Sequence, residues 1–426
     1  MDERDSLIER RNQAFGDGAH LFYDTPVHLQ RGEGVWLFDV DGTRYLDLYN
    51  NVPCVGHGNP RVAKAVADQI ATLNVHNRYL HDAAIEYAER LMALHHDQIT
   101  SMVMCCSGTE AVEVALTMAR AATGRRGVIC TDATYHGNST QVGALTHLPV
   151  GASRGNAFSI TTPQRFRPQQ NGLSDAELCD LHLDELASTI AGIRASGEGV
   201  AALIMCSILA NEGLPNAPSG FFVRAAEMVR AAGGLVVADE VQAGFARSGN
   251  WWGYQTSGFE PDIVVMGKPM GNGIPVSAAA ANHSLVSQFR EQFRYFNTYA
   301  SSPVQAAAGN AVLDEIIERG LVEQVARVGR EVSEGLVELQ ANEPRMGDIR
   351  GHGLFLGIDW VQPHTTDPDP AGAKALVEAL KRRGMLLGQS GQHGNVLKIR
   401  PPLVFDSEHA GLFLGAFEAA LADVDR

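Results

Sequence analysis

"PDIVVMGKPMGNGIPVS", residues 261–277, places a lysine directly behind a short apolar run. The run 263–266 predicts a strand that is buried on both faces. Lys268 follows it, in a segment that also holds Pro269 and glycines at 271 and 273. Lysine is rarely buried without a partner. Either the strand reaches the protein surface here, or the amine is kept dry so that it can act as a nucleophile.

The rest of the central chain alternates in the same way between short apolar runs and helical stretches. Helical patterns cover 110–123 and 219–233. Near-continuous apolar strands that alternate with helices predict an α/β fold, with a mostly parallel sheet covered by helices. In such a sheet ligands bind beyond the carboxyl ends of the strands. The expected strands are 101–107, 127–132, 200–208, 234–240 and 262–267.

The two ends of the chain have a different pattern. Residues 34–52 alternate with period 2 around an Asp-Gly turn at 41–42, which predicts a hairpin. Amphipathic helices begin near residue 311, and two later stretches, 347–361 and 395–405, predict short strands. We therefore expect a large domain over 58–310 and a smaller α+β domain built from 1–57 and 311–426.

Composition narrows the class of protein. The chain has 426 residues, 45% of them hydrophobic, and a formal net charge of −15. No block of lysine and arginine indicates nucleic-acid binding, and no apolar run has the length of a membrane span. The six cysteines follow no metal-ligand spacing, so no metal site is expected. Without a signal peptide, the sequence predicts a reducing, cytoplasmic location; residues 1–13 predict a charged helix.

Polar residues follow several of the expected strands. Ser107, Gly108 and Thr109 lead into a helix, with Glu110 placed to close a capping box. A small-residue helix start offers free N–H groups and a positive dipole end, which suit a phosphate. The alternative is simply a well-capped helix.

Two further strand ends carry a carboxylate and an aromatic ring. Asp239 ends one strand, where it needs either a salt bridge or a cationic ligand atom. Tyr135 and His136 follow another; the tyrosine ring is either core packing or a face for a planar cofactor. Together with Lys268 and a phosphate-binding helix start, these residues form the set required to hold pyridoxal 5′-phosphate. The sequence therefore predicts that cofactor.

The stretch "VVADEVQAGFARSG…PDIVVMGKPMGNGIP" resembles the class III aminotransferases, fold type I enzymes that use pyridoxal phosphate, and the resemblance covers nearly the whole chain. It implies that Lys268 is the Schiff-base lysine and Asp239 the partner of the pyridine nitrogen. It implies further that Val241 packs on the ring opposite Tyr135. Other implied cofactor residues are Gln242 near the ring hydroxyl, His136, the phosphate donors Ser107, Gly108 and Thr109, and Thr298. In the family that threonine reaches the cofactor of the neighbouring subunit, so a homodimer with shared active sites is implied, while the choice between dimer and tetramer stays open.

Several stretches, among them "YLDLYNNVPCVGHGNP" and "GNVLKIRPPLVF", resemble more narrowly the ammonia-phospho-lyases of this family. Where many family transaminases carry a carboxylate-binding arginine, this chain has Lys398, and Cys206 stands where an acidic residue is usual. We expect Arg400, two residues further on, to face the other side of the strand. These departures favour a substrate without an α-carboxylate.

The predicted function is elimination of phosphate and ammonia from O-phosphoethanolamine or a similar amino-alkyl phosphate, giving an aldehyde. The amine substrate is thus expected to be phosphorylated, and its phosphate needs cations or donors. The candidate substrate residues are Tyr23, Asn51, Arg78 and Lys398. The alternatives are an ω-aminotransferase, a mutase or racemase on the same scaffold, and a non-catalytic homologue that binds the cofactor.

Overall fold

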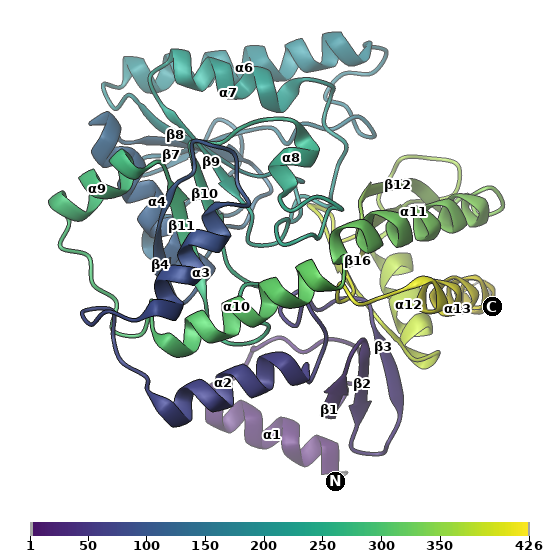
Figure 1. The fold of residues 1–426 in the computed structure, drawn as a ribbon. Coiled ribbons are helices and arrows are strands. Elements are labelled where there is room, and N and C mark those ends of the chain that lie inside the picture. The colour runs from purple at the N-terminus through teal and green to yellow at the C-terminus, as the bar shows by residue number, and fades with distance from the viewer. Residues whose placement is uncertain (1–2, 425–426) are drawn as a thin grey trace.

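The computed structural model describes residues 3–424, and its centre is an eight-stranded sheet (Figure 1). All five runs expected as buried strands are strands of this sheet. In spatial order the strands are β4 (Ser101–Cys105), β11 (Ser277–Ala281), β10 (Ile263–Met266), β9 (Leu235–Asp239), β8 (Val200–Cys206), β5 (Gly127–Thr131), β7 (Ala157–Ile160) and β6 (Ser153–Arg154).

The core of the sheet is parallel, from β10 through β9, β8 and β5 to β7. The exceptions lie at the edges: β11 runs antiparallel between β10 and β4, and β6 pairs antiparallel with β7. Strand β11 is not among the strands expected from the sequence. Its run "SAAAA" has little strand propensity, and burial between two strands overrides that preference.

Helices cover both faces of the sheet, which explains why its strands are apolar throughout. In β10, Ile263 and Val265 pack into the core beneath α4, and Val264 and Met266 pack into the core on the opposite face. The helices around this sheet are α3 (Asp82–Met92), α4 (Gly108–Thr123), α5 (Thr140–Gly143), α6 (Asp175–Ala195), α7 (Phe221–Ala231), α8 (Gly253–Ser257) and α9 (His283–Gln292).

Helix α4 begins and ends at the residues that the sequence predicted, but its first turn differs in one detail. Ser107 Oγ accepts from the N–H of Glu110, and Gly124 ends the helix with φ 64°. The Glu110 carboxylate does not return to Ser107, as a capping box requires. It accepts from the N–H of Cys106 at 2.7 Å, which ties the end of β4 to the helix.

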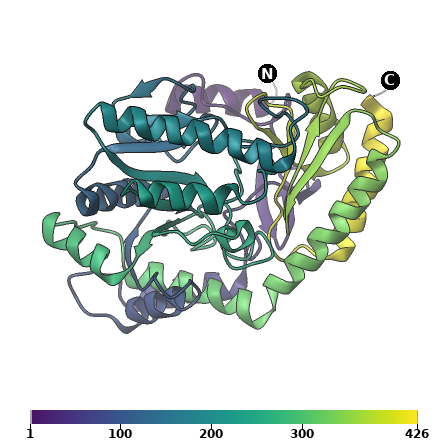
Figure 2. The same cartoon turned by 90° about the horizontal axis from the view of Figure 1, so that it is seen from above.

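Both ends of the chain contribute to the smaller part of the molecule, at the right in Figure 2. The predicted hairpin forms, with its turn at Gly42 (φ 81°), and β14 from the C-terminal part extends its sheet. One sheet has the order β1 (Leu29–Glu33), β2 (Trp36–Asp39), β3 (Arg44–Asp47), β14 (Met385–Leu386), and the other β12 (Met346–His352), β13 (Phe355–Trp360), β16 (Val396–Ile399), β15 (Gly388–Ser390).

The remaining helices pack around the two parts: α1 (Glu3–Phe15), α2 (Pro60–Thr72), α10 (Pro303–Glu318), α11 (Leu321–Gln340), α12 (Pro370–Arg382) and α13 (Ser407–Val424). Helix α10 packs against α2 and α3 and continues toward α11 (Figure 2). The expected boundary at residue 310 falls inside α10, and the division into domains remains a prediction. Within residues 3–424 no helix is long and apolar enough to cross a bilayer.

Candidate active site

A cavity of about 120 Å³ lies where β8, β9 and β10 end. It gathers residues from loops far apart in the sequence, as the rule for ligand sites in open parallel sheets leads one to expect. Its wall consists of Gly108, Thr109, Tyr135, His136, Gly137, Cys206, Asn211, Asp239, Val241, Gln242 and Lys268.

Lys268 projects into this cavity from the loop after β10. Its side chain is accessible to solvent because it points into the hollow of the cavity, although protein atoms surround it on the other sides. Burial in that wall, followed by the positive charge of Arg400, lowers its pKa below the ordinary value for lysine, whereas Asp239 acts in the opposite direction. The loop itself is fixed by Asn272, whose side chain bonds the N–H of Val55 and the carbonyl of Gly56. Both readings of the opening motif therefore hold in part: the lysine is accessible, and it is desolvated.

Asp239 is held rigidly at the end of β9. Its Oδ1 accepts from the N–H of Val241 at 3.0 Å, and its Oδ2 lies 2.6 Å from Nδ1 of buried His136. Since an ionised carboxylate can only accept, Nδ1 is the donor. Thr134 Oγ1 bonds the other ring nitrogen of His136 at 2.9 Å. The histidine thus fixes the orientation of the carboxylate that faces the cavity.

Glycines allow the backbone to close around the cavity. A Cβ on Gly108 would lie 3.2 Å from the Val241 side chain, and one on Gly137 would lie 2.5 Å from Thr109 Oγ1. Gly137 has φ 150°, which disfavours other residues. The start of α4, at Gly108 and Thr109, is therefore open to a ligand, while Ser107 lies exposed at the N-cap.

These residues fit pyridoxal phosphate. The cavity holds a desolvated amine for covalent attachment, an oriented carboxylate for a ring nitrogen, and an uncrowded helix N-terminus for a phosphate. Tyr135 and Val241 are both in the wall, where flat and branched side chains can cover a ring. Lys268, Asp239 and the start of α4 would hold the group.

Two more cations converge on Gln242, a residue of the wall, although neither of them lines the cavity itself, and here one expectation was wrong. Lys398 Nζ donates to Gln242 Oε1 at 3.3 Å, and Arg400 Nη1 donates to the same oxygen. The two side chains therefore share a side, whereas Arg400 was expected to face away. The reason is elementary: strand residues two apart point to the same face. Phe355 lies beneath both cations, with its ring centre 5.2 Å from Lys398 and 5.4 Å from Arg400.

The buried cations here lack carboxylate partners. Lys398 is 3% exposed and Arg400 6%, and among residues 3–424 neither forms an ion pair with Asp or Glu. Lys398 also donates to the carbonyl of Ala210, and Arg400 to that of Tyr49. Burial lowers both pKa values, that of Lys398 to well below its ordinary range. An uncompensated buried cation is costly, so the site favours an anionic ligand.

A third buried cation, Arg247, joins the segments that form this wall. It donates to Asn51 Oδ1 at 2.9 and 3.1 Å and to the carbonyls of Leu354 and Pro401. Burial lowers its pKa to about 9. Arg247 therefore ties the loop after β9 to the N-terminal segment and to the strand that carries Lys398.

None of the four predicted substrate residues lines the cavity: Lys398 lies behind Gln242, and Tyr23, Asn51 and Arg78 lie elsewhere. Asn51 is buried, with Oδ1 bonded to Arg247 and Nδ2 donating to the Gln242 carbonyl at 3.1 Å, so its side chain is already occupied. Tyr23 donates its hydroxyl to the Leu387 carbonyl at 3.1 Å. Arg78 is exposed and stacks on the Phe296 ring at 4.1 Å.

Sequence reasoning missed Asn211 altogether. Asn211 Oδ1 accepts from Gln242 Nε2 at 3.0 Å, and its Nδ2 donates to the Tyr135 carbonyl at 2.8 Å. It thereby links the cation-bearing wall to the loop that carries the aromatic ring. The only signal was its position just after β8, at the carboxyl edge of the sheet.

Glu240, next to Asp239, points away from the cavity into the core. It is fully buried and accepts from Ser207 Oγ and from the N–H groups of Gly253 and Tyr254, at 2.5 to 2.8 Å. Burial outweighs these donors and raises its pKa to about 7.

The raised pKa of Glu240 predicts a pH-dependent stability. Because the folded pKa exceeds the ordinary value, its stabilising contribution is present below about pH 4.5 and is lost as pH rises through 7. From pH 5 to pH 8 the wild-type protein should lose about 2.5 kcal/mol relative to Glu240→Gln. Denaturant unfolding at both pH values measures this, with Glu227→Gln, at an exposed position of α7, as the control. A difference that does not change with pH would contradict the assignment.

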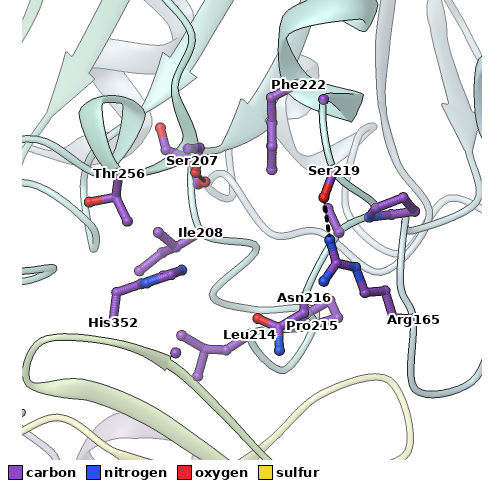
Figure 3. Close-up of a pocket in the computed structure, with 15 residues that line it drawn as sticks. Arg165, Ser207, Ile208, Leu214, Pro215, Asn216, Ser219, Phe222, Thr256 and His352 are labelled. Carbon is purple, nitrogen blue, oxygen red and sulfur yellow. Dashed lines mark hydrogen bonds between the residues drawn. The ribbon is translucent and has the colours of Figure 1, made fainter. Parts of the chain in front are cut away.

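A separate hollow of about 270 Å³ is lined by Ser207, Ile208 and His352, among others (Figure 3). It is larger, but its charged group is already satisfied: Arg165 pairs with Asp175 at 2.7 Å and donates to Ser219 at 2.8 Å. None of the predicted cofactor residues lines it. The chemistry therefore belongs to the smaller cavity around Lys268.

Known proteins resemble this chain over nearly its whole length. A solved phospholyase from Arthrobacter, in complex with phosphoethanolamine, is 40% identical, with a TM-score of 0.94 over 98% of this chain and 99% of its own. An "Alanine--glyoxylate aminotransferase 2-like" protein of Drosophila melanogaster is 36% identical, over 98% of this chain and 87% of its own length. An "Ethanolamine-phosphate phospho-lyase homolog 1" of Caenorhabditis elegans is 33% identical over 99% and 94%.

The family is shown by a match to residues 20–421, and it confirms the predicted fold class and cofactor. The matching family model is that of class-III aminotransferases. A Bacillus anthracis aminotransferase also shares the fold, with 27% identity and a TM-score of 0.87 over 99% of this chain and all of its own. The chain belongs to the class-III aminotransferase family of pyridoxal-phosphate-dependent enzymes.

Proposed function

We propose that this protein is a phospho-lyase that eliminates phosphate from O-phosphoethanolamine or a similar small amino-alkyl phosphate. The products are acetaldehyde, ammonia and phosphate when the substrate is O-phosphoethanolamine. The observation that carries the proposal is the pair of buried cations, Lys398 and Arg400, which converge on one oxygen at the wall of the Lys268 cavity without a carboxylate partner within residues 3–424. The similar Arthrobacter phospholyase, solved with phosphoethanolamine, supports it.

The charge of the site distinguishes the possible anions. Two neighbouring cations match the double charge of a phosphate monoester better than the single charge of a carboxylate. Each loses its water contacts on burial, so an anion that pairs with both recovers the most free energy. A substrate without an α-carboxylate needs no second anion site.

The side chains divide the work as follows. When bound, pyridoxal phosphate supplies an electron sink that makes the Cα proton of the substrate acidic. Lys268, with its lowered pKa, is the base that takes this proton. Asp239, oriented by His136, keeps a positive charge on the ring nitrogen. Arg400 and Lys398 bind the phosphate of the substrate.

Incubation of the cofactor-loaded protein with O-phosphoethanolamine, in the absence of any keto acid, tests the proposal. We expect phosphate and acetaldehyde to be released in equal amounts. An ω-aminotransferase would release no phosphate. It would instead convert the cofactor to pyridoxamine phosphate with a simple amine and recover on addition of pyruvate, and that result would overturn the proposal.

We further propose a homodimer with shared active sites. Thr298 is exposed, and large apolar side chains are exposed around it and around Arg78: Tyr79, Leu80, Phe296 and Tyr299. Apolar surface of this kind favours a protein contact. In such a dimer Thr298 and Arg78 are proposed to serve the site of the neighbouring subunit. A cytoplasmic location is proposed because all six cysteines are unpaired.

A further inference from the structure

We propose that Lys398 is the general acid that protonates the departing phosphate, whereas Arg400 only binds it. This inference rests on the proposed phospho-lyase function and assigns different roles to the two cations. Both point at the same oxygen, Gln242 Oε1, from positions two residues apart at the end of β16. An anionic oxygen that replaced Gln242 Oε1 would receive one hydrogen bond from each of them.

The chemistry of the leaving group requires such an acid. During elimination the Cα–H bond breaks and its electron pair forms the Cα–Cβ double bond. The Cβ–O bond breaks, and its electron pair remains on the phosphate oxygen. Without a proton, this group would leave as the strongly basic phosphate trianion. With the proton of an ammonium group it leaves as hydrogen phosphate, so a positioned acid accelerates the step.

Of the two cations, only the lysine can lose a proton at ordinary pH, because a guanidinium stays protonated. Two features around Lys398 favour release of its proton before the step. Its side chain is buried and Arg400 lies beside it; both lower its pKa, while Cys206 and Glu212 act in the opposite direction. When Lys268 becomes an ammonium by taking the Cα proton, its new charge further favours proton loss from Lys398.

One proton is taken up and one is released within the site, so no other proton donor or acceptor is needed for this step. Lys268 gains the proton that leaves Cα, and Lys398 gives one to the phosphate oxygen, so the pair keeps a single net charge. In this proposal the Gln242 side chain must move aside before a phosphate oxygen can contact both cations. It lines the cavity, and its amide occupies the point where the cations meet. Asn211 accepts from Gln242 Nε2 at 3.0 Å and limits how far the amide can move.

The test compares Lys398→Met and Lys398→Arg with Arg400→Lys in the cofactor-loaded protein. For O-phosphoethanolamine we expect kcat to fall by about 10²-fold or more in both Lys398 variants, including the one that keeps the charge. Exchange of the Cα protons with deuterium oxide, followed by NMR, should continue, because Lys268 is intact. Arg400→Lys should mainly raise KM.

A second substrate, whose leaving group needs no proton, distinguishes loss of acid catalysis from a general loss of active-site structure. Fluoride release from 2-fluoroethylamine should stay within about tenfold of wild type in Lys398→Arg. Binding of 3-aminopropylphosphonate, which has no phosphate ester to cleave, is measured by calorimetry and should weaken much less than kcat falls. Equal losses of fluoride and phosphate release, or a change in KM alone, would overturn the acid role. If the wild-type protein releases no phosphate, the proposed function fails first and the acid role falls with it.

Discussion

Replacement of Lys268 by alanine is expected to lower phosphate release from O-phosphoethanolamine by about 10³-fold or more. The lysine is the basic amine in the wall of the cavity, and burial followed by the charge of Arg400 lowers its pKa, which favours the neutral form that a base requires. Both covalent attachment of the cofactor and removal of the Cα proton depend on that amine. Phosphate release is measured with saturating cofactor, so that weaker cofactor binding does not limit the rate.

Two controls separate loss of the amine from loss of the fold. Lys268→Arg keeps the positive charge but cannot act as a base, so it should be as inactive as the alanine variant. After borohydride reduction, mass spectrometry should show the cofactor attached to the wild-type protein and to neither variant. Substantial phosphate release by Lys268→Ala, with an unchanged melting temperature, would show that another group is the base.

Replacement of Asp239 by asparagine is expected to lower the rate by about 10²- to 10³-fold, the usual loss when one fixed electrostatic partner is removed from an active site. The amide is nearly the same size as the carboxylate but carries no charge, so the ring nitrogen of the cofactor loses its counter-charge. The short contact of 2.6 Å to His136 loses its charge as well. Steady-state rates and cofactor affinity should both be measured, so that a slower reaction can be distinguished from weaker binding of the cofactor.

His136→Gln is the matched control for this prediction. It removes the histidine that orients Asp239 but leaves the carboxylate in place, held by the N–H of Val241 at 3.0 Å. We therefore expect a loss well below that of Asp239→Asn. Equal losses in the two variants would mean that orientation, and not charge, is what Asp239 contributes.

Much of the fold and of the cofactor site could be predicted from local sequence. The five buried strands were predicted because apolar runs bounded by turn residues have few other interpretations. Lys268, Asp239 and Tyr135 follow strand ends, so the rule for open parallel sheets brought them together in advance. The strand β11 was missed because an alanine run carries no strand signal of its own, and only its neighbours make it one.

The substrate side was predicted less well, for a physical reason. Asn51 and Tyr23 were chosen as possible donors to a phosphate, and the structure shows their polar atoms bonded to protein partners. Arg400 was misplaced by an error about strand geometry rather than by missing data. A polar group is free to bind a ligand only if no neighbouring protein group already bonds it. Those neighbours come from distant parts of the chain, so the sequence alone does not identify them.

The sequence by itself determined the family and the cofactor and predicted the lysine that binds it, because these follow from short motifs whose residues lie close together in the chain. Only the tertiary structure decided what surrounds the cavity. Lys398 and Arg400, in and just after β16, are 156 and 158 residues from Gln242 in the loop after β9, and they meet at its oxygen because Arg247 joins that strand end to the loop. Their missing carboxylate partners became visible only once both were buried, and it is that uncompensated charge that points to phosphate.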